Sequence, residues 1–418
     1  MPDSSIVLSK RNKPFFQTSQ VIVFVTIFLI LAVAGIFSYN YFLKTNVVQI
    51  PKIKDQDKTK QIAKVDVIEP ISLKSTLKPK DVFVGLGTFT NTGFTSTATS
   101  PINLFTGNQV LEEKKNNLKL RPWAVLISNK PEDRPQISVS EADIVYEAVN
   151  ELGTTNLLGI FYENRPVEIG PIGDLKYYFA SFALEYSPFL IFNSAKQGTV
   201  DKPNLVDPVV DVYKFIGSYG LYSISKDKTD EMIFSKVVNG NSTQSILDIG
   251  KLYGYLGKVY GSYLWVDSDN FNAWGFKEDL PKVGIKEFSF NFWDLADYEV
   301  KWVYNSGQNN YLRYQGGLAF IDKKNGEQVK TKNIILLFSK ETQVTDAYNN
   351  LNYELVGKGD AYFYLDGELI EGAWEKLSFT SKTKFYDKNS NEIKFNKGNT
   401  WVEILPTSSK SKVVNIKI

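Results

Sequence analysis

Three carboxylates recur at four-residue intervals in one short segment of the chain. Asp143 and Glu147 lie in the stretch SEADIVYEAV, and Glu151 follows it. Positions four apart share a face on a strand or on a helix, so these side chains could converge. Paired carboxylates could carry out acid-base chemistry such as glycoside cleavage, or bind a hard cation through oxygen alone. Arg134 and Gln136, from the preceding loop PEDRPQ, would complete such a site.

A structural interpretation competes with this one. Arg134 would then form an ion pair with Asp143, Glu147 or Glu151 and simply fix the loop. The chain contains only five arginines, at positions 11, 121, 134, 165 and 313, and otherwise uses Lys for positive charge. An Arg that persists against this bias could make a planar, bidentate contact that Lys cannot reproduce.

A second candidate site is a predicted helix start at residues 170–176. Asp174 is a typical N-cap for the helix DLKYYFASFALEY that would follow it. The amides of a helix N-terminus attract anions, but an Asp cap supplies its own negative charge at that place. Lys176 and Arg165 would be the cations nearby, so we expect weak anion binding. The alternative is that Gly-Pro-x-Gly is only a turn that enters the helix.

Two residue types are missing from the chain, and their absence excludes several chemistries. Without Cys there is no thiolate nucleophile and no zinc-thiolate site, and without His there is no Ser-His-Asp triad or imidazole-bound metal. The 48 basic and 46 acidic residues leave a net charge of +2, which makes nucleic-acid binding improbable. The acidic stretches DNFNAWGFKED and DKNSNE lack the spacing of a calcium loop. We predict neither a metal nor a cofactor.

The N-terminal part of the chain predicts a membrane anchor. Residues 21–43 carry no charge and are long enough to cross about 30 Å of hydrocarbon. Lys10, Arg11 and Lys13 precede this segment, so residues 1–20 should stay cytoplasmic and the C-terminal part should be extracytoplasmic. A signal peptide that is cleaved after Ala34 is the other interpretation, because Ala-Val-Ala follows an apolar core there.

The remainder predicts an α+β protein: a flexible tether, a mixed α/β domain and a predominantly β domain. Residues 44–103 are charged, or rich in Thr, Ser and Gly, which is typical of a tether. Strands are expected at 123–128, 144–148, 157–163 and from 188, and helices at 174–186 and 244–256. From 288 onward the pattern changes to short strands and turns, with Asp366-Gly367 as a hairpin signal. We therefore predict separate domains at 104–282 and 285–418.

Several long motifs resemble the YerB-like bacterial lipoproteins, the family of domain of unknown function 3048. They are LFTGNQV from Leu104, RPWAVLISNKPEDRPQISVSEADIVYEAVNELGTTNLLGIF from Arg121, IGPIGDLKYYF from Ile169, VKWVYNSGQNNYLRYQGG from Val300 and GKGDAYFYLDGELIEGAWEK from Gly357. The resemblance covers residues 104–406 and implies an N-terminal and a C-terminal family part. It implies no activity, because none is established for that family. The chain has a predicted membrane span where the family has a lipid-modified Cys.

The chain departs from this family pattern at several polar positions. Ser128-Asn129-Lys130 stands where the family typically has Asp-Asn-His, and Asn156 stands where it has Arg. Gly173 and Lys176 replace two further arginines, and Phe320 replaces a frequent His. Asn129 keeps the family residue, and we count it among the candidate binding residues. The resemblance therefore implies a retuned or degenerate member.

Three classes of function remain open. The missing nucleophile machinery and the long tether favour an envelope-facing binding or scaffold module for a glycan, a peptide or a protein partner. The alternatives are a carboxylate-dependent hydrolase of cell-wall polymer and a non-catalytic, degenerate paralogue. The hydrolase requires two carboxylates about 5 to 9.5 Å apart in an open cleft.

Overall fold

The computed structural model describes residues 100–197, 206–229, 231–239, 242–265, 271–282 and 284–417. The predicted membrane span at 21–43 and the tether up to residue 99 lie outside these residues. Within the described residues, no helix is both long and apolar enough to cross a membrane.

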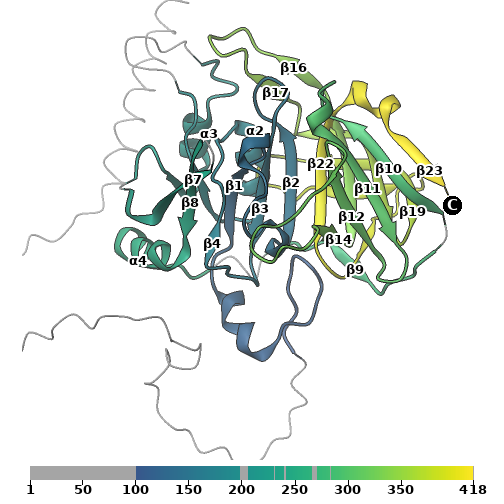
Figure 1. Ribbon diagram of the computed structural model, residues 1–418, viewed down its shortest axis with the longest axis horizontal. Helices are drawn as coiled ribbons and strands as arrows, with labels where there is room; N and C mark the ends of the chain where they lie inside the picture. Colours follow the sequence, from purple (N-terminus) through teal and green to yellow (C-terminus); the bar gives the residue numbers. More distant parts are fainter. Residues whose placement is uncertain are drawn as a thin grey trace, which may run out of the picture. The chain divides into compact units, whose positions relative to one another are not determined.

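One mixed sheet of ten strands forms the centre of the described region (Figure 1). Its strands, in spatial order, are β20 (Lys384–Asp387), β19 (Glu368–Lys376), β18 (Gly357–Leu365), β15 (Asn333–Ser339), β22 (Thr400–Pro406), β2 (Ile144–Val149), β3 (Thr155–Phe161), β1 (Trp123–Ser128), β5 (Phe189–Phe192) and β6 (Ser223–Ser225). The pairs β15–β22, β22–β2, β1–β5 and β5–β6 are parallel, and the other pairs are antiparallel.

Both faces of this sheet are buried, because alternate residues of each central strand enter two different hydrophobic cores. On β1, Ala124 and Leu126 belong to one core, whereas Val125 and Ile127 belong to the other. Strands that are buried on both faces have continuous apolar sequences. The runs WAVLIS and NIILLFS therefore predicted β1 and β15 with the observed bounds.

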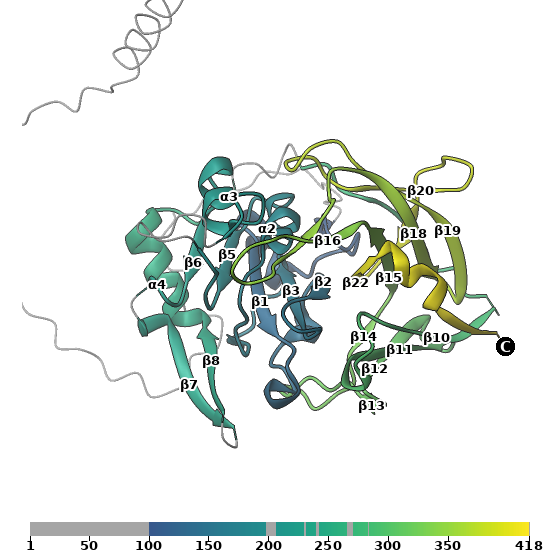
Figure 2. The same cartoon turned by 90° about the horizontal axis from the view of Figure 1, so that it is seen from above.

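Helices cover one face, and strands with one further helix cover the other (Figure 2). The first face packs against α2 (Tyr177–Leu184) and α3 (Val212–Tyr219). The second packs against a six-stranded sheet and α4 (Ile249–Tyr260). The six-stranded sheet consists of β13 (Leu318–Ala319), β12 (Asn310–Gln315), β11 (Glu299–Asn305), β10 (Ile285–Asn291) and β23 (Val414–Lys417), with β14 (Lys330–Thr331) paired to β12.

Smaller strand pairs and short helices complete the described region. The pairs and triplet are β4 (Glu168–Ile169) with β8 (Ser242–Asp248) and β7 (Phe234–Asn239), β16 (Glu341–Gln343) with β17 (Leu351–Tyr353), and β21 (Lys394–Asn396) with β9 (Gly275–Lys277). The 3₁₀ helices are η1 (Glu112–Lys119), η2 (Pro131–Asp133), η3 (Val139–Glu141), η5 (Glu231–Ile233), η7 (Ala296–Tyr298) and η8 (Thr407–Lys412).

The predicted division into domains at 104–282 and 285–418 is wrong for the central sheet. Strand β22, near the C-terminus, lies between β15 and β2, and its residues from Thr400 to Glu403 pair with β2 residues from Ile144 to Glu147. The change in sequence pattern near residue 284 is real, but it marks where the six-stranded sheet begins. The mixed α and β content that the sequence predicts is observed.

The helix predicted at 244–256 is also partly wrong. Residues up to Asp248 form β8, and α4 begins only at Ile249. Asp248 is the N-cap, and its side chain accepts a hydrogen bond of 3.0 Å from the Lys251 amide. A strand and a helix that follow one another directly share one apolar run, so periodicity alone misplaced the boundary.

Candidate functional site

The strand β2 separates the three predicted carboxylates instead of bringing them together. Asp143 precedes the strand, Glu147 lies in its middle and Glu151 follows its end. A six-residue strand is about 20 Å long, so the two outer carboxylates lie at opposite ends of β2. Each of the three belongs to a different environment.

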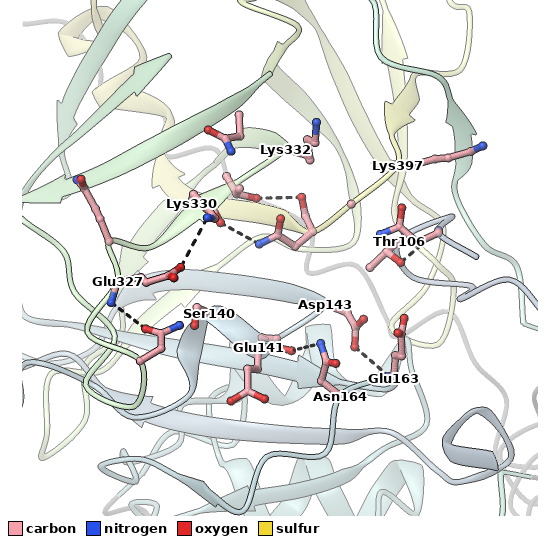
Figure 3. Close-up of a pocket in the computed structure, with 18 of the residues that line it drawn as sticks. Thr106, Ser140, Glu141, Asp143, Glu163, Asn164, Glu327, Lys330, Lys332 and Lys397 are labelled. Carbon is pink, nitrogen blue, oxygen red and sulfur yellow. Dashed lines mark hydrogen bonds and ion pairs between the residues drawn. The ribbon is translucent and has the colours of Figure 1, made fainter. Parts of the chain in front are cut away.

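Asp143 lies at a cleft of about 550 Å³, the largest among those described here (Figure 3). Its lining comes from distant segments: residues 106–114, 140–143, 163–164, 310–332 and 397–399. In Figure 3, Glu141, Asp143 and Glu163 lie on one side of the cleft, and Lys330, Lys332 and Lys397 lie on the other. We call the side with these three carboxylates the acidic wall and the side with these three lysines the basic wall. Each wall also carries one opposite charge that lines the cleft, Lys114 beside Glu163 and Glu327 beside Lys330.

Asp143 is held by a buried hydrogen-bond network. One of its carboxylate oxygens accepts from the Tyr162 amide at 2.7 Å, and the other accepts from Asn103 Nδ2 at 2.7 Å. The same Asn103 nitrogen donates to Glu163 Oε2 at 3.0 Å, so the two carboxylates lie within about 6 Å of each other. Burial raises the pKa of Asp143 to about 6.

The lysines of the basic wall find their ion pairs on their own side of the cleft. Lys332 pairs with Asp279 at 2.5 Å, Lys397 with Glu278, and Lys330 with Glu327 at 3.7 Å. Within the described residues, no ion pair joins these lysines to the acidic wall. On the acidic wall, Glu163 pairs with Lys114 at 3.8 Å and Glu141 pairs with Lys324 at 2.6 Å. Both walls therefore have ion-pair partners on their own side of the open space.

Glu147 lies in a fully buried junction between the two large sheets. Arg313 of β12 bridges Glu147 Oε2 at 2.5 Å and Glu403 Oε1 at 2.8 Å, and the three side chains have no exposed surface. Burial and the nearby Glu147 charge raise the pKa of Glu403 to about 8. Buried, ion-paired carboxylates fix one sheet on the other and are not open to a substrate.

Four predicted site residues do gather at this junction. The Asn129 side chain donates to Glu147 Oε1 at 3.1 Å, and its oxygen accepts from Arg134 Nε at 3.1 Å and from Gln136 Nε2 at 3.0 Å. Arg313 and Glu403 were not among the residues predicted for the site. The scarcity of Arg in the chain was the signal that could have identified Arg313.

The ion pair expected for Arg134 is made by Arg313 instead. Arg134 donates to the Asn129 carbonyl at 2.9 Å and to the Asp297 carbonyl at 3.0 Å, and it lies 4.8 Å from the centre of the Tyr298 ring. Within the described residues, it has no ion pair with Asp143, Glu147 or Glu151. Arg134 does fix its loop, but through carbonyl groups.

Asp174 is not the cap of a helix. Helix α2 begins at Tyr177 with Lys176 at the N-cap position. Asp174 Oδ1 accepts from Asn193 Nδ2 at 2.7 Å and from Ser194 Oγ at 2.6 Å. Lys176 pairs with Glu151 at 3.1 Å, which places this predicted carboxylate beside the start of α2.

Arg165 also lies away from the start of α2. Its guanidinium stacks 4.2 Å from the centre of the Trp123 ring and donates to the carbonyl groups of Leu120 and Arg121. The predicted cationic pair of Lys176 and Arg165 is therefore not formed.

Most positions that depart from the family-like pattern line one small pocket. Ser128, Lys130, Asn156 and Gly173 surround a space of about 180 Å³. A Cβ atom at Gly173 would lie 3.0 Å from the Ser128 amide nitrogen and 2.9 Å from Asn156 Nδ2. An Arg at position 173 would therefore clash in this chain.

Comparisons with known proteins identify the family of this chain. Residues 105–237 match the N-terminal domain, and residues 289–402 the C-terminal domain, of a family described as protein of unknown function (DUF3048). The chain is 24% identical over 299 residues to YerB of Bacillus subtilis strain 168, a candidate lipoprotein, covering 71% of this chain and 84% of YerB. The crystal structure of Bacillus subtilis YerB is similar in fold, with a TM-score of 0.63 and 20% identity, over 76% of this chain and 100% of that one. The chain therefore belongs to the YerB-like DUF3048 family.

Proposed function

We propose that this chain is an extracytoplasmic binding module that holds a short dipolar peptide in the cleft at Asp143. The observation that carries this proposal is the placement of ion-paired carboxylates on one side of the cleft and ion-paired lysines on the other, whose local partners a ligand with both charges could replace. A ligand with an ammonium group at one end and a carboxylate at the other would complement both walls. The volume of about 550 Å³ lies within the usual range for small-ligand sites, about 300 to 1,000 Å³.

The character of the lining favours a peptide over a glycan. Among the described residues that line the cleft there is no aromatic ring on which a sugar could stack, but there are several amides. Asn164, Asn310 and Asn399 can each donate and accept hydrogen bonds, as a peptide backbone also does. The Asn310 oxygen is buried and has no partner within the described region, so a ligand amide could satisfy it.

The proposed location rests on the sequence and on the relative. Bacillus subtilis YerB is named as a candidate lipoprotein, and residues 21–43 of this chain predict a membrane span in place of a lipid. The described region would then lie outside the cell membrane, with residues 1–20 inside. Protease added to intact spheroplasts should digest the region after Lys44, and full protection of that region would contradict this topology.

Calorimetric titration of the full chain tests the ligand. We expect triglycine, which has both charged ends, to bind at least about tenfold more tightly than its acetylated and amidated form. The double variant Lys330→Gln with Lys332→Gln, and separately Glu163→Gln, should each weaken this preference. Lys358→Gln is the matched control, because Lys358 is exposed and lies away from the cleft.

Three outcomes would contradict the peptide proposal. The first is equal affinity for the charged and capped peptides, and the second is an equal loss of the preference for triglycine in the control variant. The third is tighter binding of an N-acetylglucosamine trimer than of triglycine. The last result would favour a glycan as the ligand.

A second candidate function, a carboxylate-dependent hydrolase, is supported by the Asp143 and Glu163 pair. The two carboxylates lie close together at an open cleft, and the raised pKa of Asp143 is suitable for a general acid. However, both oxygens of Asp143 already accept hydrogen bonds, and the residue is only 3% exposed. Release of soluble fragments from dye-labelled cell wall, lost in Glu163→Gln, would favour the hydrolase.

A further inference from the structure

The small pocket of about 180 Å³ lies at the opposite end of β2 and β3 from the cleft. The ends of β1 and β2 and the start of β3 contribute Ser128, Asn150 and Asn156 to it, and β8 contributes Thr243 and Gln244. It shares no lining residue with the cleft at Asp143. It is therefore a separate candidate site.

Two buried amide oxygens in this pocket have no hydrogen-bond partner among the described residues. Asn156 Nδ2 donates to the Asp174 carbonyl at 2.8 Å, which fixes the amide so that Oδ1 is the unpaired atom. Asn150 Oδ1 is also buried, and within the described region neither oxygen accepts a hydrogen bond. Asn156 is 1% exposed and Asn150 is 5% exposed. Buried acceptors are rarely left unsatisfied, so two around one small space indicate a missing donor.

The charges around the pocket favour a cationic donor. Three carboxylates, Glu132, Asp133 and Asp174, line it together with a single cation, Lys130. Asp133 is used locally, because it accepts from Ser128 Oγ at 2.5 Å and from Gln244 Nε2 at 3.2 Å. Within the described part of the chain, the Asp174 carboxylate accepts its two hydrogen bonds through Oδ1. Its Oδ2 therefore remains available to a ligand.

An organic cation suits this pocket better than a metal ion. The described residues contain no group of three His, Cys, Asp or Glu side chains that could hold a metal. A volume of 180 Å³ is several times the roughly 30 Å³ that one water molecule occupies. An ammonium group offers three N–H donors, which matches two amide oxygens and one carboxylate oxygen.

We infer that this pocket binds the protonated primary amine of a small organic ligand. The amine donates to Asn150 Oδ1, Asn156 Oδ1 and the Asp174 carboxylate, and Glu132 adds negative charge at the rim. Lys130 opposes the ligand charge and limits the affinity. This inference does not depend on the peptide proposed for the other cleft.

Thermal denaturation of the full chain with two salts tests the inference. Methylammonium chloride should raise the melting temperature in a saturable way, whereas tetramethylammonium chloride, which has the same charge but no N–H group, should not. Asp174→Asn and Glu132→Gln should each weaken the apparent methylammonium affinity, by about tenfold for Asp174→Asn because it removes a charged acceptor. Lys130→Met should strengthen it.

The controls separate this pocket from the acidic wall of the cleft. Glu163→Gln and the exposed Glu299→Gln should leave the methylammonium effect unchanged. Equal stabilisation by the two salts, or loss of the effect in Glu163→Gln, would overturn the inference. So would binding that occurs only in Lys130→Met, because the pocket would then be filled by its own lysine.

Discussion

At the scale of single residues, Arg313 shows what one guanidinium does that an ammonium cannot. It bridges two buried carboxylates through separate nitrogens, and it lies 4.5 to 5.1 Å from the ring centres of Trp302, Phe320 and Trp401. A planar group fits between rings and still reaches two acceptors. Arg313 therefore links the two large sheets in the fully buried space between them.

Arg313→Lys should cost about 2 to 3 kcal/mol in the free energy of unfolding, because one of the two buried carboxyl groups would lose its hydrogen-bond partner. Arg134→Lys should cost about 1 kcal/mol, since Arg134 loses neutral carbonyl contacts at a half-exposed place. Urea denaturation of the full-length variants measures both. Equal losses of unfolding free energy in the two variants would show that the buried bridge stabilises the protein no more than the carbonyl contacts of Arg134 do.

The raised pKa of Glu403 predicts how the stability of the protein depends on pH. Burial raises its folded-state pKa to about 8 from an ordinary value of 4.5, so the folded protein binds this proton more tightly than the unfolded chain does. The resulting stability is fully present below about pH 4.5 and is lost as the pH rises through about 8. Glu403→Gln should remove this decline. The stability of the variant relative to the natural chain should therefore increase as the pH rises from 5 to 8.5.

Melting temperatures at pH 5, 7 and 8.5 would measure the effect of Glu403→Gln. The exposed Glu299→Gln serves as the control, and its curve should run parallel to that of the natural chain. A parallel curve for Glu403→Gln as well would mean that Glu403 is ionised in the folded state.

At the scale of elements, the hairpin between β18 and β19 joins the two large sheets. Its turn residues Asp366 and Gly367 have φ values of 55° and 80°, as the Asp-Gly pair predicts. Asp366 Oδ1 accepts from Asn309 Nδ2 at 2.7 Å, and the Gly367 amide donates to the Tyr311 hydroxyl at 2.9 Å. The turn is therefore a contact between sheets as well as a chain reversal.

Gly367→Ala should destabilise the protein for two reasons. The positive φ costs about 1 kcal/mol, and the new Cβ would lie 2.5 Å from the Tyr304 ring and 2.8 Å from the Lys282 carbonyl oxygen, which adds about 1 to 3 kcal/mol. Gly326→Ala isolates the first effect, because Gly326 has a φ of 70° and a Cβ added there would meet no atom within 4 Å. Equal urea midpoints for the two variants would contradict the steric argument.

At the scale of the whole described region, the sheet order makes the two family parts mutually dependent. Strand β2 from the first part pairs with β22 from the second, and the Glu147–Arg313–Glu403 junction buries charge that neither part could neutralise alone. If residues 100–282 were separated from the rest, they would expose an edge of β2 and leave Glu147 without its partner.

We therefore expect a single cooperative unfolding transition for the described region. Native-state hydrogen exchange should give the amides of β2 and β22 the same opening free energy, within about 1 kcal/mol, because neither strand can open without the other. Two separate calorimetric transitions, with β2 and β22 exchanging at different free energies, would show that the parts fold independently after all.

The sequence by itself predicted the elements whose signals are local. The buried strands 123–128 and 333–339, the Asp366-Gly367 turn and the mixed α and β content all follow from short runs of residues. Arg134, Gln136 and Glu147 belonged to one predicted group, and Asn129 was a separate candidate from the family resemblance. Asp143 and Glu151 of the same predicted group lie elsewhere. The YerB-like resemblance was confirmed by the comparisons.

Only the tertiary structure decided what these residues contact. Arg313 lies 166 positions after Glu147, and Glu403 lies 90 positions after Arg313. No local pattern specifies pairings over such distances in the sequence. The insertion of β22 beside β2 brought them together and replaced two predicted domains by one sheet. Periodicity determines which face of a strand is buried, whereas the choice of its neighbour depends on the packing of the whole sheet.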